Sequence, residues 1–321
     1  MKTTKNIIAT LLLLLTVTFG FAQDGDGDVS NIQEFTPSKL LKKGQWDIKV
    51  FTGVYTQTKR TDARSNSVDI LRETFLTNTN EIYTGISKNS RVNIGLIFQI
   101  RSNQVGGDNY YDALGVFRFK NDKNSTRSGL TTIAPSIRVQ PFKNIANFSF
   151  TSSFFIPLFE DTSTLNGLTD GNGDPAFTPY LDQRSFAWET RFFFDHTFGG
   201  NKWQVFTELD FRFNFGEDAA DADPLTENLN ERFANESLFL PSTVFLSYFP
   251  SSKSTVFVNA QQSFLLDLGN GFAQNSTQLG FGGKYQLTRV LNIEASYGKI
   301  VRGNNFQGLG NTTSIGLRAI F

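Results

Sequence analysis

The chain has no cysteine, a single methionine and a single histidine. Without cysteine it forms no disulfide, offers no thiolate to a metal ion and carries no acylated lipoprotein anchor. Lysine plus arginine and aspartate plus glutamate number 30 each, so the formal net charge is zero. Proteins that bind nucleic acid have a basic field that this chain lacks, so we expect no nucleic-acid partner.

Long apolar runs are also missing after the first 22 residues. A membrane-spanning helix needs about 20 consecutive apolar residues, and no later stretch approaches that length. The chain is instead rich in phenylalanine, with 34 residues, although its mean hydropathy is slightly negative. A lipid-facing β-barrel has this combination, because only alternate residues of each strand contact lipid.

The first 22 residues have the organisation of a secretory signal peptide. Two lysines precede the apolar stretch Ile7–Phe19, and Gly20 and Ala22 are small residues at the positions that a signal peptidase reads. The apolar stretch is too short for a spanning helix. We expect cleavage after Ala22, which leaves residues 23–45 as a periplasmic N-terminal segment, either a loose tail or a partial plug, before a barrel of residues 46–321.

The remaining sequence alternates between apolar and polar residues, most clearly between positions 203 and 215. The apolar face of that stretch carries Trp203, Val205, Thr207, Leu209, Phe211, Phe213 and Phe215. The other face is polar, with Phe206 as the exception. Alternation of this length exceeds the roughly five or six residues of a typical soluble strand. It suits a tilted strand that crosses a membrane.

The same pattern recurs along the whole chain. It predicts strands near 46–58, 71–87, 91–102, 129–140, 147–159, 184–198, 202–215, 237–249, 254–266, 275–288, 291–302 and 310–321. Short turns alternate with longer connections, which are expected near 59–70, 103–128, 160–183, 216–236, 267–274 and 303–309. This alternation is typical of outer-membrane barrels. The sequence therefore predicts an all-β fold, a transmembrane up-and-down antiparallel β-barrel of about 12 strands.

The last strand carries an expected insertion signal. Ile315, Leu317 and the terminal Phe321 lie on one face of an alternating strand that ends on an aromatic residue. This pattern is similar to the C-terminal signal of outer-membrane barrels, so the barrel-insertion machinery and outer-membrane lipid are expected partners. Trp46 and Trp203 begin their strands and are expected to lie at the membrane interface.

Charged residues on the inward face of the predicted strands are the candidate functional residues, because a charge that faces lipid costs several kcal/mol. Eight are basic and six acidic: Asp47, Lys49, Glu81, Arg101, Arg138, Glu189, Arg191, Glu208, Asp210, Arg212, Lys284, Glu294, Arg302 and Arg318. They either pair across a narrow lumen and close it or line a water-filled pore with a weak basic bias. The first hypothesis is a passive, porin-like channel for small polar or anionic solutes. The second is a closed barrel that presents its loops to partners.

Catalysis is the least favoured function. His196 is the only histidine, and alternation places it on the outward face with Phe194 and Phe198, near a short turn. A barrel lipid hydrolase, the third hypothesis, needs a base beside a serine, and we find no serine in a matching position. We therefore expect that the chain is not an enzyme.

One acidic, glycine-spaced segment is a weak candidate for a calcium site. Asp170, Asn172 and Asp174 offer oxygen ligands of the kind that Ca²⁺ prefers. The segment lacks the bidentate glutamate that ends an EF-hand loop, so a solvated loop explains it at least as well. No other metal and no cofactor is expected.

Two short stretches resemble those of a bacterial group. The signal that ends in Phe21-Ala22-Gln23 resembles signals of Bacteroidota-type secreted proteins, and Thr36–Lys49, which leads into the first strand, resembles the same region of uncharacterised outer-membrane β-barrels of that group. Those barrels are often described as channels or transporters. The resemblance implies an outer-membrane location and a barrel fold, and it implies no solute and no functional residues.

Overall fold

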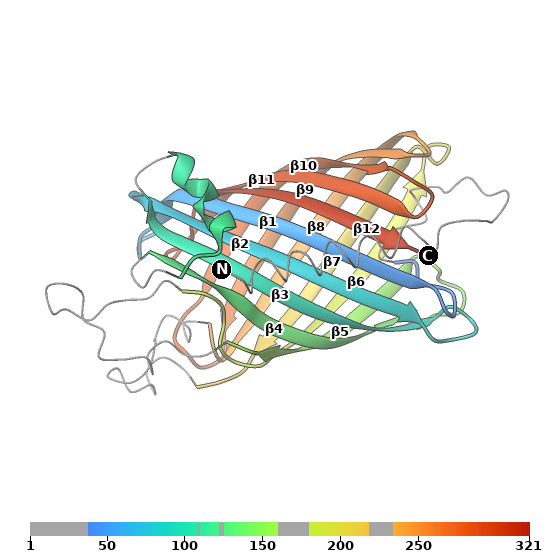
Figure 1. Cartoon of the computed structure of the whole chain (residues 1–321), viewed down its shortest axis with the longest axis horizontal. Helices are drawn as coiled ribbons and strands as arrows, with labels where there is room; N and C mark the ends of the chain where they lie inside the picture. Colours follow the sequence, from blue (N-terminus) through green and yellow to red (C-terminus); the bar gives the residue numbers. More distant parts are fainter. Residues whose placement is uncertain (1–37, 108–109, 122–124, 160–179, 218–233) are drawn as a thin grey trace, which may run out of the picture.

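The computed structural model describes residues 38–107, 110–121, 125–159, 180–217 and 234–321. The described strands form one closed antiparallel barrel in which every strand pairs with its neighbours in the sequence (Figure 1). The strands are β1 (Trp46–Thr61), β2 (Ser67–Gly85), β3 (Val92–Gly107), β4 (Thr126–Val139), β5 (Phe148–Pro157), β6 (Ala187–Phe198), β7 (Trp203–Asn214), β8 (Ser237–Ser251), β9 (Ser254–Asp267), β10 (Gln274–Gln286), β11 (Leu291–Gly303) and β12 (Asn311–Ile320). The predicted all-β, twelve-stranded barrel is confirmed.

The first and last strands close the barrel. They pair from Asp47 opposite Ile320 to Thr56 opposite Asn311. Trp46 and Phe321 exchange backbone hydrogen bonds of 2.8 and 3.0 Å just beyond that ladder. Closure pairs the polar backbone groups that an open sheet would leave at its edges, and a strand in lipid requires this.

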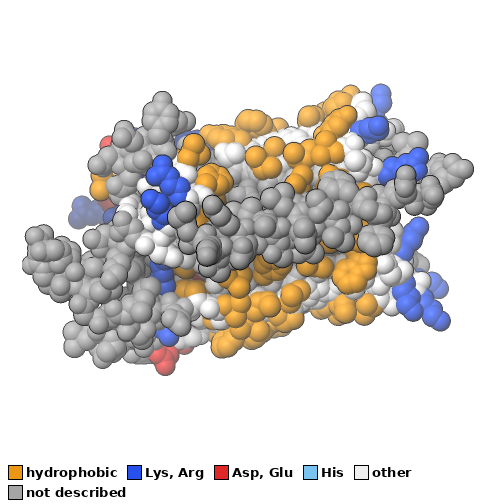
Figure 2. Space-filling model, viewed as in Figure 1, with side chains coloured by type: hydrophobic (Ala, Val, Ile, Leu, Met, Phe, Trp, Pro, Cys, Tyr) orange, Lys and Arg blue, Asp and Glu red, His pale blue; other side chains and the backbone are white. Residues whose placement is uncertain are grey.

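The two faces of the barrel wall differ as the alternation predicts. On β9, Val256, Val258 and Phe264 are exposed on the outer surface, whereas Phe257 and Leu265 are buried inside. Figure 2 shows apolar side chains over the middle of the barrel and basic side chains near its two ends. An apolar surface this extensive is far larger than a soluble monomer exposes, so the outer wall is suited to lipid.

Short and longer connections lie at opposite ends of the barrel, which we call the turn end and the loop end. Residues 86–91, 140–147, 199–202, 252–253 and 287–290 form the turn end. One predicted long loop, 59–70, is wrong, because β1 and β2 continue as a hairpin to a turn at 62–66. Asp62 holds this turn by accepting backbone hydrogen bonds from Arg64 and Asn66, and the bond from Asn66 is the main cause that lowers the pKa of Asp62.

The predicted loop 103–128 also contains regular structure. β3 extends to Gly107, and the 3₁₀ helix η2 (Tyr110–Arg118) follows it. The helix packs on the outer wall, where the Ser102 hydroxyl donates a 2.6 Å hydrogen bond to the Val116 carbonyl oxygen. Val116 is buried, whereas Leu114 and Phe117 remain exposed. Among the described residues, no helix is long and apolar enough to cross a membrane.

Candidate functional site

A network of ion pairs crosses the lumen near the turn end, and Asp47 is one of its centres. Asp47 on β1 is only 1% exposed. Its carboxylate accepts two 2.8 Å hydrogen bonds from Arg318 on β12 and one of 3.2 Å from Arg138 on β4. Two arginines on different strands thus share one buried carboxylate, which the low dielectric of the interior makes a strong arrangement.

Glu81 on β2 is the second centre. It lies 2.7 Å from Arg138, 3.3 Å from Lys49 and 3.9 Å from Arg191. The Arg138 guanidinium lies 3.4 Å from the ring centroid of Tyr83, which places a cation over an aromatic face. Because Arg191 belongs to β6, the contact with Glu81 joins two arcs of the barrel that are not neighbours in the sheet.

Arg191 carries the network onto the next strands. Its Nε lies 3.2 Å from Glu189 and its Nη1 lies 3.8 Å from Glu208 on β7. Arg212 lies 3.9 Å from Glu189, and Asp210 is the direct cross-strand neighbour of Arg191. The predicted residues of β1, β2, β4, β6, β7 and β12 therefore gather into one cluster of alternating sign.

Three predicted lumen residues lie apart from this cluster. Lys284 and Glu294 form their own pair at 3.0 Å between β10 and β11. Arg101 on β3 pairs at 3.0 Å with Asp182, which lies between β5 and β6. These two pairs remain inside the barrel but do not touch the main network through a described ion pair.

Arg302 departs from the predicted pattern. A register shift lies between Thr277 and Gln278 on β10, so Arg302 is opposite Thr277 instead of following the alternation of β11. This places Arg302 in phase with the outward-facing Leu279, and its side chain is exposed. With Arg302 outside the lumen and Arg101 neutralised by Asp182, the predicted basic bias of the lumen disappears.

Residues 38–45, which precede the first strand, enter the mouth of the barrel at the turn end. The Ser38 hydroxyl donates a hydrogen bond to the Asp195 carboxylate on β6. The backbone of Leu41 exchanges hydrogen bonds of 3.2 and 3.3 Å with the side-chain amide of Asn93 on β3. Ser38 and Leu41 are both buried. Residues 38–45 of the predicted N-terminal segment, which we call the plug, therefore fill part of the mouth along the β2–β6 arc.

The backbone of the plug lies close against Gly85 on β2, where a larger residue would not fit. A Cβ atom there would lie 2.1 Å from the Lys42 carbonyl oxygen, far closer than atoms approach without a shift. We expect Gly85→Ala to push residues 41–44 away and to speed tryptic cleavage after Lys42 and Lys43 by about ten-fold. Mass spectrometry of timed digests measures this rate.

The matched control for this experiment is Gly53→Ala. Its added Cβ would meet its nearest neighbour, the Ser314 hydroxyl oxygen, at an ordinary 3.7 Å. Cleavage in this variant should therefore match that of the unmodified chain. Equal cleavage rates in the Gly85 and Gly53 variants would show that the plug tolerates the extra carbon and is held loosely.

Residues 180–183 fill the same arc nearer the loop end. Asp182 pairs with Arg101 and accepts a 3.2 Å hydrogen bond from Thr132. The Asn103 side chain donates hydrogen bonds of 2.6 and 3.0 Å to the carbonyl oxygens of Tyr180 and Leu181. Leu181 is buried. These contacts hold residues 180–183, the latched segment, on the inner wall, where the segment narrows the lumen along β3 and β4.

The arc of the barrel formed by β10 to β12 has a neutral inner wall of mostly small side chains, whereas β8 and β9 also present Phe239, Phe245 and Phe257 to the lumen. The inward positions of β10 to β12 between the Lys284–Glu294 pair and the loop end include Ser276, Gln278, Gly280, Gly282, Ser296, Gly298, Ile300, Thr312, Ser314 and Gly316. Short side chains and glycines leave more space along this arc than the arginine-rich arc leaves. The lumen is therefore divided lengthwise into a filled side and a freer side.

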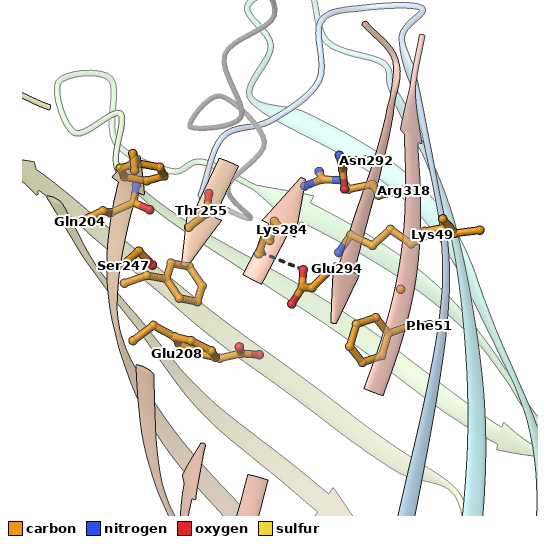
Figure 3. A pocket seen from close by; sticks show the side chains of 15 residues that line it. Lys49, Phe51, Gln204, Glu208, Ser247, Thr255, Lys284, Asn292, Glu294 and Arg318 are labelled. Carbon is orange, nitrogen blue, oxygen red and sulfur yellow. Dashed lines mark ion pairs between the residues drawn. The ribbon is translucent and has the colours of Figure 1, made fainter. Parts of the chain in front are cut away.

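Two cavities lie beside the ion-pair network. One, of about 220 Å³, extends between β7 and β1 and is bordered by Lys49, Glu208, Lys284, Glu294 and Arg318 (Figure 3). The other, of about 320 Å³, is bordered by Glu81, Glu189, Arg191, Asp210 and Arg212 among others. Lys49 and Phe51 line both cavities, so these two side chains separate neighbouring spaces of one lumen.

Several lumen residues were not predicted from the sequence. Ser38 and Asp182 lie outside the strands, so alternation says nothing about them. Phe51, Phe206 and Phe245 face the first cavity although they are apolar. Only Phe206 had a signal, since it breaks the alternation of residues 203–215.

The other predicted residues lie on the outer wall or outside the part of the chain that the structure describes. Ile315 and Phe321 are exposed, and Leu317 shares their outward phase. His196 stacks on Phe198 at a ring-centroid distance of 6.3 Å. The weak calcium candidate Asp170, Asn172 and Asp174 and the predicted signal peptide lie outside the described residues. Within the described part of the chain, no three His, Cys, Asp or Glu side chains gather as a metal site.

Comparisons with known proteins support the fold. No protein-family model matches the sequence, and no curated protein matches it. An outer membrane channel from Pseudomonas putida F1 matches the structure with a TM-score of 0.61 and 10% identity, covering 93% of this chain and 100% of that one. The β domain of a Bordetella autotransporter matches with a TM-score of 0.50 and 11% identity, covering 86% and 99%. The chain therefore shares the twelve-stranded closed fold of outer-membrane barrels.

Proposed function

We propose that the chain resides in an outer membrane and forms a narrow passive channel for small polar solutes. The apolar outer belt and the exposed Trp46 and Trp203, which begin their strands at the turn end, support the membrane location. The turn end then faces the periplasm and the loop end faces outward, as is usual for such barrels.

The observation that carries the channel proposal is the lengthwise division of the lumen. The plug, residues 180–183 and most of the ion-pair network lie along β1 to β7, and mostly small neutral side chains line β10 to β12 beyond the Lys284–Glu294 pair. Solutes would pass along that freer side, beside the 220 Å³ cavity. Because the charges near this path are balanced in sign, the channel should discriminate by size more than by charge, and the anionic preference suggested by the sequence loses its basis.

Single-channel recording in planar bilayers tests this proposal. A channel gives ohmic steps in potassium chloride with weak ion selectivity, and liposomes that contain it swell in small polar solutes. Heat-modifiable gel mobility shows separately that the barrel is folded. A folded barrel that inserts into the bilayer but passes no current would overturn the channel proposal.

A pair of serines on the freer side offers a test of the path itself. Ser296 and Ser314 are direct cross-strand neighbours on the inner wall. We expect Ser296→Trp with Ser314→Trp to lower conductance by more than about half, because each added ring has a bulky apolar surface. The control is Thr313→Trp, an adjacent outward position, which should leave conductance unchanged. Unchanged conductance in the double variant would place the path elsewhere.

A second candidate function is a closed barrel that presents its loops to partners. The favouring observation is that the ion-pair network already crosses the lumen from Glu81 on β2 to Arg191 on β6, while the plug and residues 180–183 fill space on the same side of the barrel. In that case the protein would be silent in bilayers, and deletion of residues 160–179 or 218–233 would abolish its activity without any change in permeability. No catalytic step is part of either proposal.

A further inference from the structure

A band of phenylalanine rings runs along the inner wall of consecutive strands. Phe193 on β6 and Phe206 on β7 have ring centroids 6.0 Å apart, Phe206 and Phe245 on β8 are 5.6 Å apart, and Phe245 and Phe257 on β9 are 5.5 Å apart. These spacings are those of favourable aromatic pairs. The rings therefore form a continuous apolar surface across four strands of the lumen.

The two central rings, those of Phe206 and Phe245, are not fully covered by neighbouring side chains. Phe193 and Phe257 are 4% and 6% exposed, whereas Phe206 and Phe245 are half-buried and line the 220 Å³ cavity. Apolar surface that faces water is unfavourable. These ring faces are therefore available to an apolar face of a solute.

The remaining boundary of the cavity is polar and carries both signs of charge. Lys284 and Glu294 form a pair at 3.0 Å, and Glu208, Lys49 and Arg318 lie around them (Figure 3). Neutral polar groups complete it: Gln204, Ser247, Thr255 and Asn292. The cavity thus presents hydrogen-bond donors and acceptors opposite an aromatic wall.

This combination of groups argues against simple ions and against hydrocarbons as ligands of the cavity. An anion would meet Glu208 and Glu294, and a cation would meet Lys49, Lys284 and Arg318. A hydrocarbon would cover the rings but would displace water from polar groups without replacing their hydrogen bonds, which is costly. A hydroxyl group both donates and accepts, so it can bond to either partner of the Lys284–Glu294 pair.

We propose that this cavity is a binding site for a neutral sugar of about one ring. Such a molecule has a C–H face that can lie on Phe206 and Phe245 and a rim of hydroxyls that can reach the charged wall. A volume of 220 Å³ lies below the roughly 300–1,000 Å³ of drug-sized pockets, which limits the ligand to a small one. The inference rests on the proposed channel function and names its substrate class. Binding must be weak, because a conducted solute has to leave.

Calorimetric titration of the full barrel in detergent with D-glucose, benzoate and tetramethylammonium tests the site independently of conductance. We expect glucose to bind and both ions to fail to compete with it. In the variant Phe206→Leu with Phe245→Leu, which keeps apolar volume but loses the flat faces, glucose affinity should fall about ten-fold. The matched control is Phe281→Leu on the outer wall, where the side chain is 59% exposed, and its affinity should not change.

The outcomes separate the site from the channel. A barrel that conducts potassium chloride but binds no glucose, or binds benzoate more tightly, overturns the sugar site and leaves the channel intact. Glucose binding without conductance supports the site and removes the channel. Equal glucose affinity in the inner and outer leucine variants would show that the rings do not form the site.

Discussion

Replacing Asp47 with alanine should lower the free energy of unfolding by about 3 kcal/mol or more. The carboxylate of Asp47 is buried and bonds to both Arg318 and Arg138. Removing it takes away the acceptor that the buried Arg138 and the part-buried Arg318 share. Breaking a buried ion pair by removing one partner costs more than the value of an average contact. Urea-dependent unfolding of the barrel in lipid vesicles, followed by tryptophan fluorescence, measures this loss.

The control for this experiment is the exposed pair of Lys59 and Asp69 near the loop end. Their separation of 3.4 Å resembles that of the buried pairs, but the Asp69 side chain is 84% exposed. Water screens such a pair, so Asp69→Ala should not change the unfolding transition beyond experimental error. If both variants unfold like the unmodified chain, the network does not stabilise the barrel, and its balance of charge would serve solute passage alone.

The fold could be predicted because lipid and lumen impose opposite chemistry on neighbouring residues. The thirteen positions from Trp203 to Phe215 alternate almost without interruption, and this pattern located β7. Near the loop end that alternation is lost. Thr56–Thr61 is polar on both faces and Ser67–Arg72 mixes Val68, Ile70 and Leu71 with charged residues, so the sequence could not show that β1 and β2 continue as a hairpin.

The lumen charges could be predicted as a group, but their partners could not. Alternation places Glu81 and Arg138 inside, yet their contact joins strands that are not neighbours in the sheet. Such a contact depends on barrel shear and register, which the local pattern does not contain. A single register shift was enough to turn Arg302 outward.

The connecting segments that fill part of the lumen could not be predicted, for a different reason. Ser38 and Asp182 belong to connecting segments, which have no periodicity, and their partners Asp195 and Arg101 are distant in sequence. Phe206 shows the opposite case. Its break in the alternation was visible, but only the neighbouring rings of Phe193 and Phe245 explain it.

A chain that begins at Gly44 should conduct at least about two-fold more than the full chain, because a twelve-stranded lumen is wider than its own side chains fill. Residues 38–43 cross the mouth at the turn end, where Ser38 reaches Asp195 and Leu41 bonds to Asn93. Their removal leaves the ladder between β1 and β12 intact, since that ladder starts at Asp47. Single-channel conductance in potassium chloride measures the change.

A chain that begins at Ser38 is the matched control, because it keeps the plug and lacks everything before it. Its conductance should equal that of the full chain if residues 38–43 alone narrow the mouth. An increase in both shortened chains would assign the narrowing to residues 23–37. An increase in neither would mean that solutes already pass along β10 to β12 without meeting the plug. The plug would then serve to hold Asp195 and Asn93 in place, and the freer arc alone would set the conductance.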